Sequence, residues 1–357
     1  MKILDQYILK RYIATFLVML LAFIPIGIII DLSEKVDKII EKEVPFAQVA
    51  DYYLDFTIYF AGLLFPLFIF LSTIFFTSRL ANNTEIIAIL SSGISFTRFL
   101  RPYLIGATVI AVIGLVFGLF LAPPANKGFN DFRYTYLKRS RAIETGEIYR
   151  QISDHDFIYL SSFRSQTKSG FDFSLEHFDG VDLKYKITAN RIRYNPENDN
   201  YTLYGYRKRT ITDQGDHFEV LAQKDTVFSF EIEDLTPVVY IAETLNYHEL
   251  NEFIRQEKRR GSSQVNAYEV VRQKRWSTPI SVFILTIIAV AVSSQKRRGG
   301  MGLNIAFGIA IGMIFVFFDK IFSTLASQSN FPPFIAVWTP NLLFGLVAFY
   351  LLKNAKR

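Results

Sequence analysis

The chain has 357 residues, of which 50% are hydrophobic and 16% aromatic, and its formal net charge is +6. This is more apolar surface than a water-soluble domain needs, and the apolar residues are gathered into long uncharged runs. Cysteine is absent, which excludes disulfides and thiolate metal sites. The histidines have no metal-ligand spacing to one another, so we expect neither a metal site nor a cofactor; they are His155, His177, His217 and His248.

Uncharged apolar runs predict six membrane-spanning helices. A bilayer core about 30 Å thick needs about 20 helical residues, and each of the first five runs has roughly that length. The last run is too long for one span, and Pro332-Pro333 divides it. The first run lacks a small-residue cleavage site, so we expect it to be retained. The predicted spans are 13–30, 56–78, 103–126, 276–295, 299–318 and 334–352.

Lysine and arginine gather in alternate connections between these spans, which accounts for the net charge without nucleic acid. The positive-inside rule places that side, with both termini, in the cytoplasm. The acidic or mixed loop between spans 1 and 2 then faces outward, as does the large insert after span 3. The cations that set this orientation are Lys2, Lys10, Arg11, Arg79, Arg98, Arg101, Lys296, Arg297, Arg298, Lys353, Lys356 and Arg357.

The loop between spans 2 and 3 predicts a short apolar helix at about residues 83–92. Asn82 with Glu85 resembles a capping box at its start, and Gly93 suits its end. An exposed apolar helix needs a cover. This helix therefore either packs under the protein's own spans or docks into a groove of a partner.

The insert, residues 127–246, predicts an all-β domain. Alternating aromatic and β-branched residues between turn-like stretches indicate antiparallel strands, and a sandwich, a jelly roll and an open barrel all remain open. The predicted strands are 155–163, 171–178, 183–194, 201–211, 217–222 and 226–232.

Polar helical stretches are predicted at both ends of the insert, at 130–147 and 247–260. The second is amphipathic, so it either packs on the insert or lies on lipid headgroups. The predicted division is a membrane part at 1–126, the β domain at 127–246, a connector helix and joint at 247–274, and a second membrane part at 275–357.

Sequence motifs for catalysis or energy conversion are missing. We find no phosphate-binding loop, no hydrolase motif and hence no catalytic residues. The spans are nearly free of charge, with Asp319 and Lys320 at the outer end of span 5, so an ion relay is not indicated either. Energy for any transport should therefore come from another chain. The Gly114-x-x-x-Gly118 and Gly308-x-x-x-Gly312 pairs predict close packing between helices of this chain.

Several motifs, in this order, resemble the LptF/LptG family of lipopolysaccharide export permeases. The likeness covers nearly the whole chain, although the insert matches in position and character rather than in motifs. The motifs are Leu4-Asp5-x-Tyr7-Ile8; residues 85–93, with Glu85 and Gly93 eight positions apart; Thr244-Leu245-Asn246-Tyr247-x-Glu249-Leu250 with Tyr268, Lys274 and Pro279; Phe317-x-Asp319-x-Ile321-Phe322; and Pro332-Pro333.

The resemblance implies a fold, a function and partners. Two paralogous permease subunits of this family bind a cytoplasmic ATPase dimer and extract lipopolysaccharide from the bacterial inner membrane. The lipid passes to a periplasmic carrier protein of β-jellyroll fold, so the insert is expected to be periplasmic and jellyroll-like. Glu85 is expected to face the ATPase, together with Ile86, Ile89 and Gly93 of the coupling helix. The Asp319 pattern favours the G-type subunit.

The lipid contacts are also inferred from the resemblance. The family's G-type member has a lysine near the outer end of span 1, whereas this chain has Asp31 there and Lys35 and Lys38 further on. We expect these two lysines to contact the lipid. On the insert, we expect one strand face, marked by Tyr185, Ile187 and Ala189, to bind it.

Two other functions compete with lipid export. A membrane-anchored sensor or scaffold would use the insert to bind a ligand outside the cell, but the inward loops are too short for an output domain. A secondary transporter is disfavoured because the spans lack charges.

Overall fold

The protein is described here by a computed structural model, which describes residues 3–137, 144–145, 148–164, 167–196, 198–212, 215–228, 230, 240–262, 264–295 and 300–355. Some residues used in the predictions above lie outside these ranges, namely Lys2, Lys296, Arg297, Arg298, Lys356, Arg357 and parts of the stretches 130–147 and 226–232. The chain forms two compact units. We call Met1–Leu137, Tyr240–Leu250 and Asn266–Arg357 the helical unit, and Lys138–Val239 with Asn251–Val265 the sheet unit.

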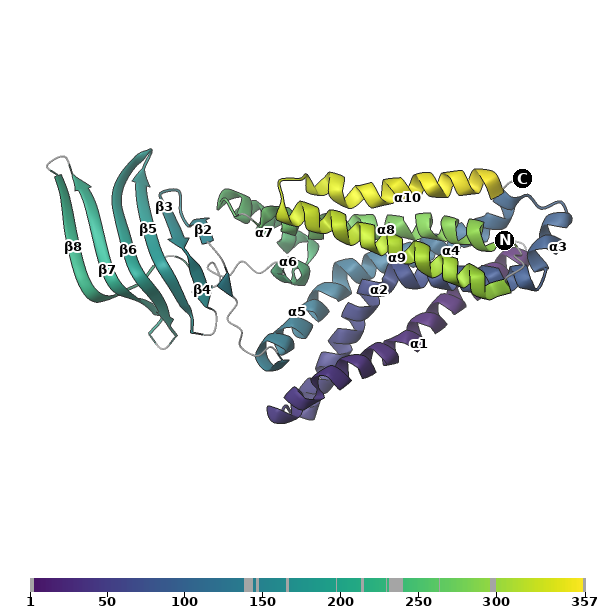
Figure 1. Cartoon of the computed structure of the whole chain (residues 1–357), viewed down its shortest axis with the longest axis horizontal. Coiled ribbons are helices and arrows are strands. Elements are labelled where there is room, and N and C mark those ends of the chain that lie inside the picture. Colours follow the sequence, from purple (N-terminus) through teal and green to yellow (C-terminus); the bar gives the residue numbers. More distant parts are fainter. Residues whose placement is uncertain are drawn as a thin grey trace. The chain divides into compact units, whose positions relative to one another are not determined.

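Within its described residues, the helical unit contains six helices that are long and apolar enough to cross a membrane, as predicted. Figure 1 shows them as long ribbons running roughly along one another. Short α6 (Tyr240–Thr244) and the start of α7 (Tyr247–Arg259) precede the fourth. The six are α1 (Ile3–Glu41), α2 (Phe46–Asn82), α4 (Phe96–Val116) continued through α5 (Ala122–Phe132), α8 (Val265–Ser293), α9 (Gly300–Gln328) and α10 (Pro333–Ala355).

The third span changes its helical geometry in the middle. A π-helical turn, η1 (Phe117–Leu121), joins α4 to α5, and a second, η2 (Arg133–Leu137), follows α5. Pro123 and Pro124 follow η1 after Ala122 and have no N–H to donate to the carbonyls one α-helical turn earlier. A wider turn lets donors further along the chain reach those carbonyls, so the helix continues instead of breaking.

Helix α1 is longer than its apolar run predicts. Its 39 residues extend about 58 Å, well beyond a bilayer core of about 30 Å. The polar stretch after the apolar run stays helical to Glu41, because its residues pack against α2 and α5 through an aromatic cluster. Tyr52 of α2 stacks on Phe132 with ring centroids 4.4 Å apart, and Tyr59 stacks on Phe129 at 4.4 Å.

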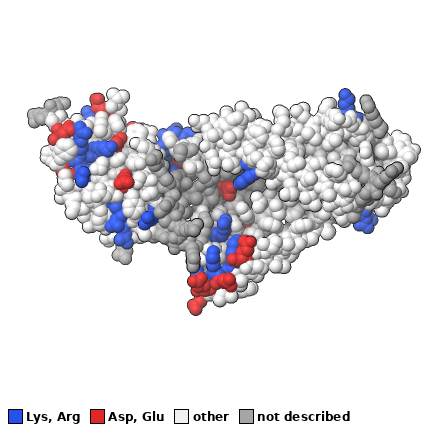
Figure 2. Space-filling view, viewed as in Figure 1, with Lys and Arg blue, Asp and Glu red and all other residues white. Residues whose placement is uncertain are grey.

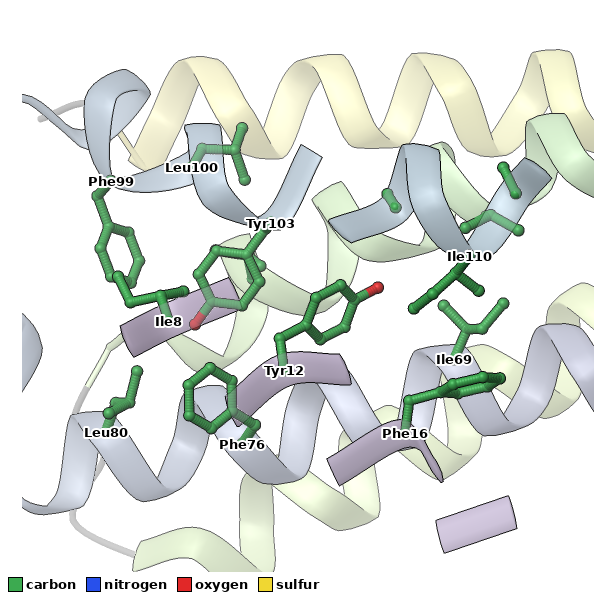
Figure 3. Close-up of a cluster of buried hydrophobic side chains, with 14 of the residues drawn as sticks. Ile8, Tyr12, Phe16, Ile69, Phe76, Leu80, Phe99, Leu100, Tyr103 and Ile110 are labelled. Carbon is green, nitrogen blue, oxygen red and sulfur yellow. The ribbon is translucent and has the colours of Figure 1, made fainter. Parts of the chain in front are cut away.

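A second aromatic cluster joins the first halves of α1 and α4 to the second half of α2 (Figure 3). Tyr103 lies at its centre, with ring centroids 5.6 Å from Tyr12 and 5.5 Å from Phe99. Tyr12 and Tyr103 are fully buried, and their hydroxyls bond to Thr286 and Thr77, each at 3.1 Å. These bonds satisfy polar groups that would otherwise be costly in an apolar core.

The glycine pair in α9 packs within the chain, as predicted. A Cβ added at Gly308 would collide with Ile74, and one at Gly312 would lie 3.0 Å from Phe70, so α9 approaches α2 closely here. The pair in the third span behaves differently. A Cβ at Gly114 would meet Phe65 at 2.7 Å, whereas Gly118 has no neighbour within 4 Å.

The sheet unit is one antiparallel sheet in which β5, β6, β7 and β8 lie side by side in the order of the chain (Figure 1). β3 and β4 lie end to end along one edge of β5, and β2 pairs with β3 while β1 pairs with β4. On the other edge of β5, β6, β7 and β8 follow in turn. The strands are β1 (Glu144–Thr145), β2 (Ile148–Gln151), β3 (Asp156–Leu160), β4 (Ser162–Arg164), β5 (Ser169–Asp179), β6 (Asp182–Asn195), β7 (Asn200–Thr212) and β8 (Gly215–Thr226).

The predicted all-β insert is therefore present, but its jellyroll detail is not confirmed. From β5 onwards each strand pairs with the next strand in the chain, as in a meander, whereas β1 pairs with β4 and β3 with β5. β8 is longer than predicted and runs on to Thr226. Val227 and Phe228 after it are not in a strand, so the strand predicted at 226–232 is wrong for these described residues. Phe228 and Phe230 instead pack on the apolar face of the sheet.

One face of the sheet carries the core of this unit. Its apolar residues do not alternate strictly: Ala189 and Ile192 of β6 are both buried, as are Leu203 and Tyr206 of β7. Gly205, which lies between Leu203 and Tyr206, has φ of +69°, and the register of β6 with β7 is the same on both sides of it. Glycine suits this position because it adopts positive φ without a steric penalty.

The connector helix packs on the sheet unit, which decides between the two predicted alternatives. Glu257 of α7 and Arg150 of β2 are both buried and form an ion pair of 3.0 Å. The backbone N–H of Gln151 also donates to the carbonyl of Arg260 at 3.1 Å.

Candidate functional site

The predicted coupling helix is α3 (Glu85–Ser91), but it does not begin as expected. The proposed capping box is wrong, because α2 stays helical through Asn82 and the residue before α3 is Thr84. Thr84 has φ of +60°, and its side chain does not cap the helix. Glu85 is then the first residue of α3, and its carboxylate is available for contacts other than a cap.

Gly93 ends this segment as predicted. Ser92 is the C-cap, and Gly93 follows with φ of +85° while its N–H donates to the carbonyl of Leu90 at 3.1 Å. A Cβ at Gly93 would meet no atom within 4 Å. Glycine is therefore favoured here by backbone conformation and not by lack of space.

The two faces of α3 differ in exposure. Ile86 is buried at 1% and belongs to the core around Tyr103, while Ile89 packs half-buried against that core. Ile87 is 52% exposed, and Ala88 and Ser91 are exposed beside it. Ile86, which was expected to face the ATPase, thus points into the protein's own core. Ile87, which sequence reasoning did not select, lies on the open face.

The start of α1 holds Glu85 from the side. The Tyr7 hydroxyl donates to Glu85 Oε2 at 3.0 Å, and Asn83 Nδ2 donates to Oε1 at 3.2 Å. Each carboxylate oxygen therefore has a donor within this chain. Tyr7 belongs to the motif before span 1, but nothing in the sequence pairs it with a residue so far along the chain.

A second contact ties α1 to the other end of the α3 segment. Arg98 in the first turn of α4 donates through both guanidinium NH₂ groups to Asp5, at 2.7 and 2.8 Å. The Asp5 side chain is 8% exposed, and Ser95 caps α4 by accepting from the Arg98 N–H at 3.3 Å. Bidentate pairs of this kind fix geometry as well as charge. The Asp5–Arg98 ion pair was not predicted either, because nothing in the sequence links two residues so far apart in the chain.

Lys35 and Lys38 have different surroundings. Lys35 forms an ion pair with Asp31, and its ammonium donates to the Tyr52 hydroxyl at 2.9 Å. Tyr52 in turn donates to Asp31 at 2.9 Å. The charge of Lys35 is thus compensated between α1 and α2, whereas Lys38 is exposed.

Asp319 of α9 pairs with Lys274 of α8 at 2.8 Å. Next to it, Arg275 donates to the carbonyl of Leu245 at 2.6 Å, just after α6. Burial raises the pKa of Glu243 in α6, although Lys274 and Lys320 act in the opposite direction. Among the described residues, no group of three or more metal-ligating side chains comes together.

The residues expected to bind lipid on the insert share one face of β6. Ala189 is buried in the apolar cluster, and Tyr185 and Ile187 pack half-buried at its edge. Tyr185 stacks on His177 with ring centroids 4.8 Å apart, and the ammonium of Lys208 lies 4.6 Å from the Tyr185 ring. Figure 2 shows charged side chains scattered over the sheet, while the long helices are largely uncharged.

Comparison with known proteins decides the family. The chain matches the family described as "Lipopolysaccharide export system permease LptF/LptG" over residues 6–354. It belongs to the LptF/LptG permease family. It is also 21% identical over 303 residues to the lipopolysaccharide export system permease protein LptG of Haemophilus influenzae, a match that covers 82% of each chain.

In this LptF/LptG permease, the motifs that are scattered along the sequence come together in pairs. Asp5 and Tyr7 meet the α3 segment, and Lys274 meets Asp319. Pro333 begins α10. With its six apolar helices, the LptF/LptG permease is a multi-pass protein of the inner membrane.

Proposed function

We propose that this chain is the permease subunit of an ABC transporter that extracts lipopolysaccharide from the inner membrane. It passes the lipid to a periplasmic bridge that leads towards the outer membrane. The observation that carries this proposal is α3, a short helix with one face fixed on the spans and the other open, and with a carboxylate at its start. Such a helix suits a groove on a separate ATPase.

The orientation follows from the distribution of lysine and arginine. We place both termini and α3 in the cytoplasm and the sheet unit in the periplasm. The coupling helix is then on the side where ATP is found, and the sheet is on the side where the lipid leaves.

The partners are those that membership of the family implies. A cytoplasmic ATPase dimer supplies the energy, in keeping with the lack of a phosphate-binding loop in this chain. A paralogous permease forms the other half of the membrane pathway, and the Haemophilus relative named LptG supports a G-type role for this chain. A periplasmic carrier of β-jellyroll fold receives the lipid.

The lipid contacts are proposed for one face of β6 and for the outer part of α1. Tyr185, Ile187 and Ala189 offer an apolar face to acyl chains. Lys38 is better placed than Lys35 to meet a phosphate, because Asp31 already compensates the charge of Lys35.

Co-purification from native membranes tests this proposal against the alternatives. A tagged chain is isolated in mild detergent, and its partners are identified by mass spectrometry. An export permease retains an ATPase and a second permease, and proteoliposomes of that complex release lipopolysaccharide to a carrier when ATP is added. A membrane-anchored sensor or scaffold retains neither ATPase nor ATP-dependent release, and that result would reject the transport function.

A further inference from the structure

Helix α3 is bounded on both sides by left-handed residues, Thr84 with φ of +60° and Gly93 with φ of +85°. A segment of seven residues between two such turns is too short to hold its direction by itself. Its direction must come from tertiary contacts. Ile86 supplies one by packing into the core, and Glu85 supplies the other.

The contacts of Glu85 and Arg98 both lead to the first turns of α1. Tyr7 binds Glu85 at the start of α3, and Asp5 binds Arg98 in the first turn of α4, the helix that follows α3. Two residues of α1 that are two positions apart thus hold both sides of the segment that contains α3. We call Asp5, Tyr7, Glu85 and Arg98 the α1 clamp.

The middle of α1 makes fewer fixed contacts. Beyond the clamp, Tyr12 bonds to Thr286 and Phe16 is buried, but Leu17, Val18 and Leu21 are at least half exposed. Between Phe16 and Ile30, Gly27 is the one buried residue. Helix α1 is therefore attached to the helical unit near its two ends, by the clamp and the core around Tyr12 at its start and by Tyr52 and the aromatic cluster further on, and only weakly between them.

We propose that Tyr7, supported by the Asp5–Arg98 pair, is a positioning residue that fixes the direction of α3 and makes α1 move with it. Force applied to the open face of α3 then reaches α1 directly, through Tyr7 and Asp5, and not only along the backbone of α2. This inference deepens the proposed coupling role and depends on it only for the source of that force.

The first experiment needs neither ATPase nor lipid transport. Tyr7→Phe removes the hydroxyl and keeps the ring, including its contact with Arg11, whose guanidinium carbon lies 5.2 Å from the ring centre. Tyr12→Phe is the matched control, since it removes a hydroxyl bond from the same helix to α8 and not to α3. Amide hydrogen exchange of residues 85–92 is measured for the full chain in lipid nanodiscs.

We expect Tyr7→Phe to speed exchange across α3 by about tenfold, the order associated with losing a hydrogen bond to a charged group. Tyr12→Phe should leave α3 at the wild-type rate. Wild-type exchange in Tyr7→Phe, or equal acceleration in both variants, would overturn the positioning role. Because no ATPase is present, this result stands even if the chain proves to have another function.

The second experiment tests transmission in proteoliposomes that contain the whole transport complex. Tyr7→Phe keeps the Glu85 charge, so ATPase binding should persist while the lipopolysaccharide released per ATP hydrolysed falls several-fold. An unchanged ratio with accelerated exchange of α3 would contradict transmission through the clamp. A complete lack of ATP-dependent release by the wild type would count against the proposed function instead.

Discussion

The Tyr7 hydroxyl donates a hydrogen bond of 3.0 Å to the Glu85 carboxylate, although 78 positions separate the two residues in the chain. Asn83 occupies the other carboxylate oxygen at 3.2 Å. The Glu85 carboxylate is therefore held in a fixed place. It is half-buried beside the open face of α3 and is a negatively charged hydrogen-bond acceptor. A partner that binds this face meets a carboxylate whose orientation is already set.

Glu85→Gln should weaken both ATPase association and lipopolysaccharide release while the protein still folds and inserts. Glutamine keeps one acceptor oxygen for Asn83, and its NH₂ group can donate to the Tyr7 hydroxyl, but it lacks the charge. Loss of one partner from a desolvated charged contact costs about 2 kcal/mol or more, whereas a water-exposed pair contributes about 0–1 kcal/mol. Co-purification and release assays measure the effect, with exposed Glu41→Gln as the control. Wild-type values for Glu85→Gln would remove the coupling role.

Glu257→Ala should strongly destabilise the protein. It leaves the Arg150 guanidinium buried without its carboxylate, and breaking a buried pair in this way costs about 3–5 kcal/mol. Glu219→Ala, which breaks the water-exposed pair with Lys224, should have little effect on stability. Urea unfolding of the full chain in detergent, followed by hydrogen exchange of β2 and α7, compares the two. Equal effects would mean that the buried pair is not needed for stability.

Glu243→Gln should stabilise the protein at neutral pH. Burial raises the pKa of Glu243, so the folded state disfavours the charged form, and stability is lost as the pH rises through this raised pKa. The variant should therefore melt at a higher temperature than wild type near pH 8, and the difference should shrink as the pH falls towards 4. Glu249→Gln is the control, because glutamine also serves in the capping pair that Glu249 forms with Asn246. A pH-independent difference would contradict this account of Glu243.

Membrane topology can be tested with single cysteines, since the natural chain has none. Val181 in the turn between β5 and β6 is 93% exposed, and Ala88 lies on the open face of α3. Val181→Cys should react with a membrane-impermeant maleimide in intact spheroplasts, and Ala88→Cys should react after lysis. The reverse pattern would refute the orientation and the proposed direction of transport.

Adjacent residues of β6 provide a sharp test of lipid binding. Ile187 packs on the apolar cluster, whereas Thr188 faces the opposite side of the sheet. A photo-crosslinking amino acid at 187 should form lipopolysaccharide adducts in a working complex, and the same amino acid at 188 should not. If both positions lack adducts while transport continues, the sheet has a structural role.

The spans were predictable because a bilayer imposes length and excludes charge, and both can be read directly from the sequence. The end of α3 was predictable because Gly93 supplies a positive φ. Its start was not, because Asn82 and Glu85 match a capping pattern that the continuing α2 overrides. The same pattern at Asn246 and Glu249 does form the reciprocal bonds, so local sequence alone cannot distinguish the two.

The clamp and the strand order could not be predicted for a different reason. Asp5 and Arg98 are 93 positions apart, and their contact depends on how α1 packs against α4. In the sheet, alternation identified most strands and the face of Tyr185 and Ile187, but it missed β1 and β2, and β1 lies in a stretch that was expected to be helical. It did not specify which strands pair, so several β architectures remained open.

The π-helical turn at residues 117–121 sets the rotational phase of everything that follows it in the third span. One residue of an α-helix corresponds to about 100° around the axis. Deleting one residue from this turn would restore an ordinary α-helix and swing Phe129 and Phe132 about a quarter-turn away from Tyr52. The π-helical turn therefore lets the two halves of this helix present different faces to their neighbours. The half before the turn, α4, packs against Tyr12, and the half after it, α5, packs against the aromatic cluster of α2.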